Sequence, residues 1–190
     1  MFNKGFIKKI RKDFFQQESE RRQIISVSND ILHQAKKIIF SLHRLDFDYS
    51  EQKFLELEKE LKKLEKNFGF LRINKEGSYK AAVEEYIEAK FFYFILKDLK
   101  INKIKGLRFQ FDSYLAGICD LTGELVRFAI NQVSLGNIKE VERVKIFIND
   151  ILKELSEFSF TGYLRTKYDQ SRNNLRKIEQ INYEVKLKYN

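Results

Sequence analysis

The 190-residue chain contains no proline, one cysteine and two histidines. Proline breaks helix interiors but is common in loops, so its absence favours a chain that is nearly all helix with short connections. A single cysteine, Cys119, excludes an internal disulfide and a cysteine-rich zinc site. With only His33 and His43, neither a two-histidine zinc site nor a nucleophilic triad is expected. Any chemistry therefore falls to carboxylates, lysines, tyrosines and hydroxyls.

Long apolar runs are also missing from the sequence. No stretch approaches the roughly 18 apolar residues that would span a bilayer. Residues 1–15 are basic and amphipathic but lack the continuous apolar run of a secretory signal. We therefore expect a soluble, cytoplasmic protein without a membrane partner.

The charge is strongly unbalanced, with 36 Lys and Arg against 27 Asp and Glu, a net +9. Such a surplus attracts polyanions, which favours nucleic acid or an acidic membrane as partner. A lysine-rich soluble surface is the plainer alternative, and charge alone places nucleic acid only slightly ahead. The 18 Phe and 9 Tyr favour either self-association or simply a bulky core.

Apolar residues recur three, four and seven positions apart along most of the chain, which is typical of amphipathic helices. The spacing predicts helices over residues 18–45, 50–68, 78–96, 112–136, 137–155 and 162–188. Ser50, Ser78 and Asp112 are candidate N-caps. Only residues 107–111 alternate as a strand would, and too briefly to form one. We predict an all-α, single-domain antiparallel bundle of about six to seven helices over residues 1–190.

Two of these helices place acidic residues beside the apolar stripe. Glu85 and Glu88 are three positions apart, and Asp120 and Glu124 are four apart, so each pair shares a helix face. If the two helices pack together, the four carboxylates converge and raise one another's pKa values unless a divalent cation relieves the repulsion. Oxygen ligands alone suit magnesium, manganese or calcium, and magnesium or manganese can activate water against a phosphodiester.

The acids have a simpler explanation as well. Glutamates at this spacing are usually solvated, and Glu124 could pair with Arg127 or Lys90. Gly117 and Gly123, which are poor helix formers, lie beside the acids and would let another helix or a ligand approach closely. Spacing alone leaves both explanations open.

The residues around these acids resemble the translin family, and in particular its catalytic branch, translin-associated factor X. Residues 120–125, Asp-Leu-Thr-Gly-Glu-Leu, are similar to a signature of the family, and residues 85–89 resemble the paired-glutamate motif of the catalytic branch. The non-catalytic branch lacks those paired glutamates. Residues 18–22 and 37–44 look like the first long helix of that branch, and residues 164–169 look like the last helix of the family.

The resemblance implies a helical subunit that assembles into a closed shell, here as a homo-octamer, around single-stranded RNA or DNA. It also implies a magnesium-dependent endoribonuclease. In that case Glu85, Glu88, Asp120 and Glu124 act as ligands of Mg²⁺ or Mn²⁺ or as activators of water.

Five basic residues are candidates for phosphate contacts, because charge-assisted contacts position a nucleic acid without reading its sequence. They are Lys36, Lys37, Arg44, Lys80 and Arg127. Tyr79 and Tyr93 are candidates for base stacking. Each of these residues could equally be a surface charge, an ion pair or part of the core.

Three functions are therefore considered. The first is a metal-dependent endoribonuclease that cuts single-stranded RNA with water as nucleophile. The second is a single-stranded RNA- or DNA-binding oligomer of the translin type without catalysis, whose acids form structural ion pairs. The third is an assembly scaffold with no nucleic-acid role.

Overall fold

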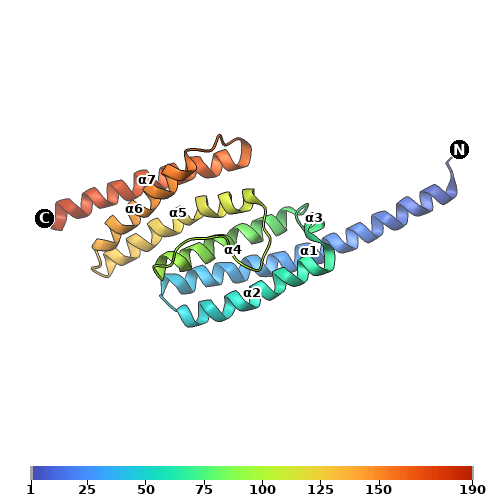
Figure 1. Ribbon diagram of the computed structural model, residues 1–190, viewed down its shortest axis with the longest axis horizontal. Helices are drawn as coiled ribbons and strands as arrows, with labels where there is room; N and C mark the ends of the chain where they lie inside the picture. The colour runs from blue at the N-terminus through green and yellow to red at the C-terminus, as the bar shows by residue number, and fades with distance from the viewer. Residues whose placement is uncertain (1, 190) are drawn as a thin grey trace.

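The computed structural model describes residues 2–189, which form seven α-helices and no strand (Figure 1). The helices are α1 (Lys4–His43), α2 (Phe47–Phe68), α3 (Phe70–Ile73), α4 (Gly77–Leu96), α5 (Phe111–Ser134), α6 (Lys139–Leu155) and α7 (Gly162–Tyr189). This confirms the predicted all-α fold, and the strand-like residues 107–111 belong mostly to the connection between α4 and α5. No helix among the described residues is long and apolar enough to cross a membrane.

Helix α4 lies between α1 and α5, while α2 packs on the outer side of α1 and both α6 and α7 pack on α5 (Figure 1). Because it is covered on both sides, α4 is apolar around most of its circumference. Tyr86, near its middle, is fully buried, and its hydroxyl donates a hydrogen bond to Glu58 of α2 at 2.9 Å. The first predicted apolar stripe is confirmed, since Ile24, Ile31 and Ile38 are at most 1% exposed.

The start of the first helix differs from the prediction. Helix α1 begins at Lys4 rather than near Glu18. Asn3 caps it by accepting hydrogen bonds from the backbone N–H groups of Gly5 and Phe6, at 2.9 and 3.2 Å. The prediction found only the part of the helix whose apolar stripe is buried within the bundle.

The predicted cap of the second helix is also wrong. Asp46 caps α2 by accepting a hydrogen bond from the N–H of Tyr49 at 3.2 Å. Ser50 instead lies inside the helix, fully buried, with its hydroxyl 2.6 Å from that of Ser41 on α1. Its polar side chain therefore joins two helices rather than capping one.

The caps predicted for α4 and α5 are wrong as well. Glu76 precedes α4 and Gln110 precedes α5, so Ser78 and Asp112 are already helical residues. Neither Glu76 nor Gln110 makes a side-chain capping bond. Both helices therefore begin without a side-chain cap, and their positions come from tertiary packing.

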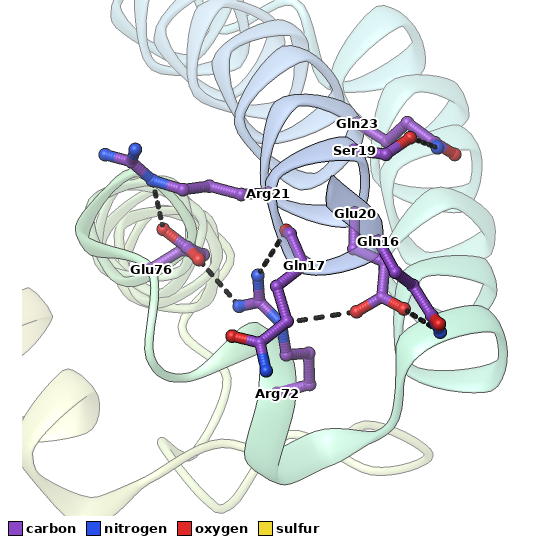
Figure 2. Close-up of polar contacts among 8 residues, drawn as sticks. All are labelled: Gln16, Gln17, Ser19, Glu20, Arg21, Gln23, Arg72 and Glu76. Carbon is purple, nitrogen blue, oxygen red and sulfur yellow. Dashed lines mark hydrogen bonds and ion pairs between the residues drawn. The ribbon is translucent and has the colours of Figure 1, made fainter. Parts of the chain in front are cut away.

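The first turns of α1 extend well beyond the body of the bundle (Figure 1). Every residue of this N-terminal arm, residues 2–17, is exposed except half-buried Ile7. At its base, Arg72 of α3 donates to the backbone oxygen of Gln17 at 3.3 Å and to the carboxylate of Glu76 at 2.6 Å (Figure 2). Glu20 and Arg21 add ion pairs to the same cluster, each at 3.5 Å, so the base of the arm is tied to α3 and to Glu76.

Helices α4 and α5 approach most tightly at Gly117, beside the predicted acids. A Cβ atom there would lie 2.8 Å from the Cγ2 atom of Ile87 and 3.0 Å from the carbonyl oxygen of Glu84. At Gly123 the nearest atom would be the amide nitrogen of Asn174, at 3.5 Å, which is an ordinary contact. Gly117 thus has the role predicted for small residues here, letting one helix backbone lie against another.

Candidate functional site

A pocket of about 570 Å³ lies where α1, α4, α5 and α7 meet. The packing of α4 against α5 brings the two predicted acid pairs to it, and α1 and α7 add cations. Its lining includes all four predicted carboxylates and three basic residues: Glu85, Glu88, Asp120, Glu124, Lys36, Arg127 and Lys167. The structure therefore gathers the predicted acids in one cavity, together with two of the five predicted phosphate contacts.

The two predicted carboxylates on α4, Glu85 and Glu88, have no partner among the described residues. Glu88 is only 7% exposed and Glu85 is half-buried, yet neither makes a hydrogen bond or ion pair with another residue of the 2–189 range. Burial raises the pKa of Glu88 well above its usual value, and the charges of Glu85, Asp120 and Glu124 raise it further. Burial also raises the pKa of Glu85, although Lys36 opposes this effect. A bound cation would relieve both burial and repulsion.

Asp120, the first of the two predicted carboxylates on α5, is paired with Lys167 of α7. The Nζ atom of Lys167 lies 2.5 Å from an oxygen of Asp120. Burial lowers the pKa of Lys167, but the hydrogen bond and the charge of Asp120 outweigh it and raise the pKa. Helix α7 is held in place nearby, because the hydroxyl of Ser171 donates to the carbonyl of Cys119 at 3.0 Å.

The second carboxylate on α5 has two partners. Nε2 of His43, at the end of α1, lies 2.5 Å from Oε2 of Glu124, and Arg127 approaches the same oxygen at 3.5 Å. The pairing of Glu124 with Arg127, one of the two considered, is confirmed. Lys90, the other, instead pairs with Glu58 at 3.0 Å.

The donors fit a hard cation by type, since they are all carboxylate oxygens. In the part of the chain described by the structure, however, no three His, Cys, Asp or Glu side chains form a ready-made metal site. Lys167 is bonded to one oxygen of Asp120, and His43 and Arg127 approach one oxygen of Glu124. Metal binding at this pocket would require at least one carboxylate to turn.

The other predicted phosphate contacts lie outside the pocket. Lys37 and Arg44 are exposed on α1 and just beyond its end, and neither lines the cavity. Lys80 is likewise outside and lies 3.9 Å from Asp112. A contact between these residues and nucleic acid remains a prediction.

The tyrosines proposed for base stacking belong to the bundle. Tyr79 is 2% exposed and is part of the core. Tyr93 is half-buried and donates a hydrogen bond to Glu51 at 2.6 Å. Burial excludes Tyr79 from contact with a base, while Tyr93 lies away from the acidic pocket.

Sequence reasoning missed three residues that surround the acids. They are His43, Lys167 and Tyr163, whose hydroxyl donates to the buried carboxylate of Glu84 at 2.6 Å. A partial signal existed for two of them, because residues 37–44 and 164–169 contribute to the family resemblance. Nothing in helical periodicity pairs them with acids many residues away.

The fold and the pocket define a class of protein: an all-helical bundle with a carboxylate-lined cavity ringed by cations. The sequence profile of the Translin family matches residues 19–189. The chain therefore belongs to the translin family, as its motifs indicated.

Several relatives have similar sequences. The Translin-associated protein X homolog of Schizosaccharomyces pombe is 28% identical over 90% of this chain and 84% of its own length. An uncharacterized protein of Methanocaldococcus jannaschii is 31% identical over 84% of this chain and 73% of its own. Human Translin is 28% identical, over only 46% of this chain and 39% of its own length. Within the family, the chain thus resembles the translin-associated protein X branch.

Solved structures have the same fold. AfC3PO superposes with a TM-score of 0.85 at 23% identity, covering 96% of this chain and 98% of that one. AfC3PO in complex with duplex RNA gives 0.82 at 21% identity, over 96% and 97% of the two chains. The apo-NeC3PO structure gives 0.83 at 21% identity, over 97% and 98%. At these identities the likeness establishes the fold.

Proposed function

We propose that this protein is a metal-dependent endoribonuclease whose carboxylate pocket holds Mg²⁺ or Mn²⁺. One observation carries the proposal: Glu88 is buried, unpaired within residues 2–189 and at the wall of a pocket that also contains Glu85, Asp120 and Glu124. A buried carboxylate without a partner is unfavourable unless it serves a ligand or is protonated. The resemblance to the catalytic branch of the family supports the same assignment.

In this proposal Glu85, Glu88, Asp120 and Glu124 hold the metal, which when bound supplies an activated water and stabilises the charge developing on the phosphodiester. The basic residues of the rim hold the substrate. Lys36 and Arg127 face the same cavity and would contact phosphate oxygens. Lys167, which pairs with Asp120, would be able to donate a hydrogen bond to a phosphate oxygen if Asp120 bound the metal instead.

RNA as the substrate is supported by two independent facts. The chain has a net charge of +9, which favours a polyanion. A protein with the same fold, AfC3PO, has been solved with duplex RNA. We propose that single-stranded RNA is the form that is cleaved and that single-stranded DNA is a further ligand. Because that relative was solved with duplex RNA, the test below compares single-stranded with duplex RNA.

Self-association is supported by the N-terminal arm. Phe2, Phe6, Ile10 and Phe14 recur every four residues along one face of the arm and are between 48 and 81% exposed. Phe15 is also exposed, but on another side of the arm, and large exposed aromatic side chains are typical of subunit contacts. We propose that a second copy of this chain covers this face in a homo-oligomer, with eight subunits implied by the family.

A second copy fits the arm better than a lipid surface does. Phe6 lies about five helical turns before Ile24, so the arm continues the same face that packs inside the bundle. Asp13 lies among the apolar residues of this face, where insertion into a bilayer would remove its carboxylate from water without a partner. A basic side chain of a protein partner could form an ion pair with that carboxylate.

A non-catalytic RNA-binding oligomer is the second candidate function. It is favoured by the pairs that Asp120 makes with Lys167 and Glu124 makes with His43 and Arg127, which resemble structural ion pairs. In that case Glu88 is held protonated by burial and plays no part in chemistry.

The deciding experiment is cleavage of end-labelled RNA, single-stranded and duplex, by the purified protein with Mg²⁺, with Mn²⁺ and with chelator. We expect metal-dependent cutting of the single strand that Glu88→Gln abolishes while RNA affinity is kept or improved, because the variant removes a negative charge and one ligand. Glu60→Gln, a change on α2 outside the pocket, is the matched control. If RNA binds but stays intact with every metal ion, the nuclease proposal is wrong and the non-catalytic RNA-binding oligomer is the remaining candidate.

A further inference from the structure

His43 is buried beside the candidate site, although the proposed chemistry gives it no role. Its side chain is 6% exposed at the end of α1. The ring lies 5.0 Å from that of Phe92 on α4 and 6.5 Å from that of Phe128 on α5, measured between centroids. Aromatic packing on two helices therefore holds the imidazole in one place.

The hydrogen bonding of the imidazole indicates which nitrogen carries the proton. Nε2 lies 2.5 Å from Oε2 of Glu124, and an ionised carboxylate can only accept, so Nε2 is the donor. Nδ1 is buried and finds no hydrogen-bond partner among the described residues. Since buried N–H groups without an acceptor are rare, Nδ1 is the bare nitrogen. The contacts of the two nitrogens thus assign the Nε2–H tautomer.

The contact constrains one of the four carboxylates that line the pocket. Oε2 of Glu124 receives the His43 hydrogen bond and the weaker approach of Arg127, while Oε1 makes no hydrogen bond to any residue from 2 to 189. One oxygen is thus anchored and the other is available to a ligand. Carboxylates that bind metals are commonly fixed by such hydrogen bonds, and loss of the supporting partner typically weakens metal binding about 10–100-fold.

We infer that His43 is a positioning residue, which orients Glu124 so that its second oxygen is presented to the metal. The inference rests on the proposed metal-dependent function. In this inference His43 itself contacts neither metal nor RNA. Its hydrogen bond connects the end of α1 to Glu124, the proposed metal ligand on α5.

The test compares His43→Gln with His43→Met, two side chains of similar size of which only the glutamine has an N–H to donate. Mn²⁺ affinity is measured from the free-ion signal in electron paramagnetic resonance, without RNA. We expect His43→Met to bind Mn²⁺ about 10–100-fold more weakly than wild type, and His43→Gln to recover much of the loss. His33→Met, on the exposed part of the same helix, should bind as wild type does.

A second measurement uses the unaltered protein and does not depend on the folding of the variants. His33 and His43 are the only histidines, so nitrogen NMR of histidine-labelled protein contains two rings. We expect the His43 ring to have the Nε2–H tautomer and its signals to shift when Mg²⁺ is added, while the His33 signals stay in place.

The positioning role would be overturned if folded His43→Met bound Mn²⁺ as tightly as wild type. It would also be overturned if Mg²⁺ bound to the protein without shifting the signals of the His43 ring. Either result would leave the nuclease proposal intact. Failure of wild type to bind Mn²⁺ or Mg²⁺ at all would instead overturn the proposed metal site, and the positioning role with it.

Discussion

The carboxylates that line the pocket differ in their ion pairs because different side chains lie next to each one. Asp120 on α5 pairs with Lys167, and Glu124 with His43 and Arg127, whereas Glu88 on α4 lines the cavity without a hydrogen bond or ion pair to another described residue. The result is one pair of acids with side-chain partners and one acid whose pKa is raised by burial and by like charge. That contrast within a single pocket is what distinguishes a candidate site from a row of solvated glutamates.

A carboxylate far from the pocket provides a pH prediction. Glu142 of α6 lies 3.0 Å from Lys186 of α7 and 3.2 Å from Lys145. These lysines, with Asn182, lower the pKa of Glu142 to about 2 from an ordinary value of 4.5. Because the folded pKa lies below the unfolded one, the stabilisation is complete above about pH 4.5 and is lost as the pH falls through about 2.

Glu142→Gln should therefore lower the melting temperature at neutral pH, and the gap to wild type should close as the pH falls towards about 2. The effect is small because the pair is exposed to solvent. Thermal melts followed by circular dichroism across this range measure it. Glu157→Gln, exposed beyond the end of α6, should change nothing. A gap that stays constant with pH would mean that the charge of Glu142 is not the cause.

At the level of helices, the contact between α4 and α5 positions the acids. Each helix contributes one pair to the cavity, and the two backbones approach closely at Gly117, beside the acids. Helix α7 then closes the cavity from the side of α5 and adds Lys167. Spacing between these helices therefore controls the site as directly as the acids themselves do.

Gly117→Ala should destabilise the protein although alanine is the better helix former. Its Cβ atom would lie 3.0 Å from the backbone oxygen of Glu84, which cannot move aside without shifting α4. We expect a loss of about 1–3 kcal/mol. Gly123→Ala, on the same helix, meets only ordinary contacts and should be neutral or stabilising by up to about 1 kcal/mol. Chemical denaturation measures both, and similar values for the two variants would contradict the close packing at Gly117.

At the level of the whole molecule, the bundle and the N-terminal arm have different roles. The bundle buries its apolar stripes, whereas the arm leaves an apolar face exposed and is tied at its base to Arg72 and its partners (Figure 2). Such a helix, already folded and with an exposed aromatic face, would lose little conformational entropy when it binds a partner.

The paired change Phe6→Glu and Phe14→Glu should lower the order of the oligomer, since two carboxylates would have to be buried in the contact. Light scattering coupled to gel filtration measures the mass, and circular dichroism checks that the bundle is still folded. Lys8→Glu, on the opposite face of the arm, should leave the mass unchanged. An unchanged mass in the doubly substituted protein would place self-association elsewhere on the molecule.

The sequence by itself determined the helices and the pairing of acids within each helix. Residues three or four apart lie on one face by helix geometry alone, which is why Glu85 and Glu88, and Asp120 and Glu124, can be grouped from their spacing along the chain. The same local rule located the stripe from Ile24 to Ile38. It missed the N-terminal arm, whose apolar face is left exposed by the rest of the described residues, and it misplaced caps such as Ser50.

Only the tertiary structure decided which charges meet. His43 reaches Glu124, 81 positions away, and Lys167 reaches Asp120, 47 positions away. Such contacts depend on which helix faces pack together and on how closely they pack. The periodicity along one helix predicts neither of these. For that reason the sequence predicted four acids as one group, and the fold divided them into two that have side-chain partners, Asp120 and Glu124, and two that have none among the described residues, Glu85 and Glu88.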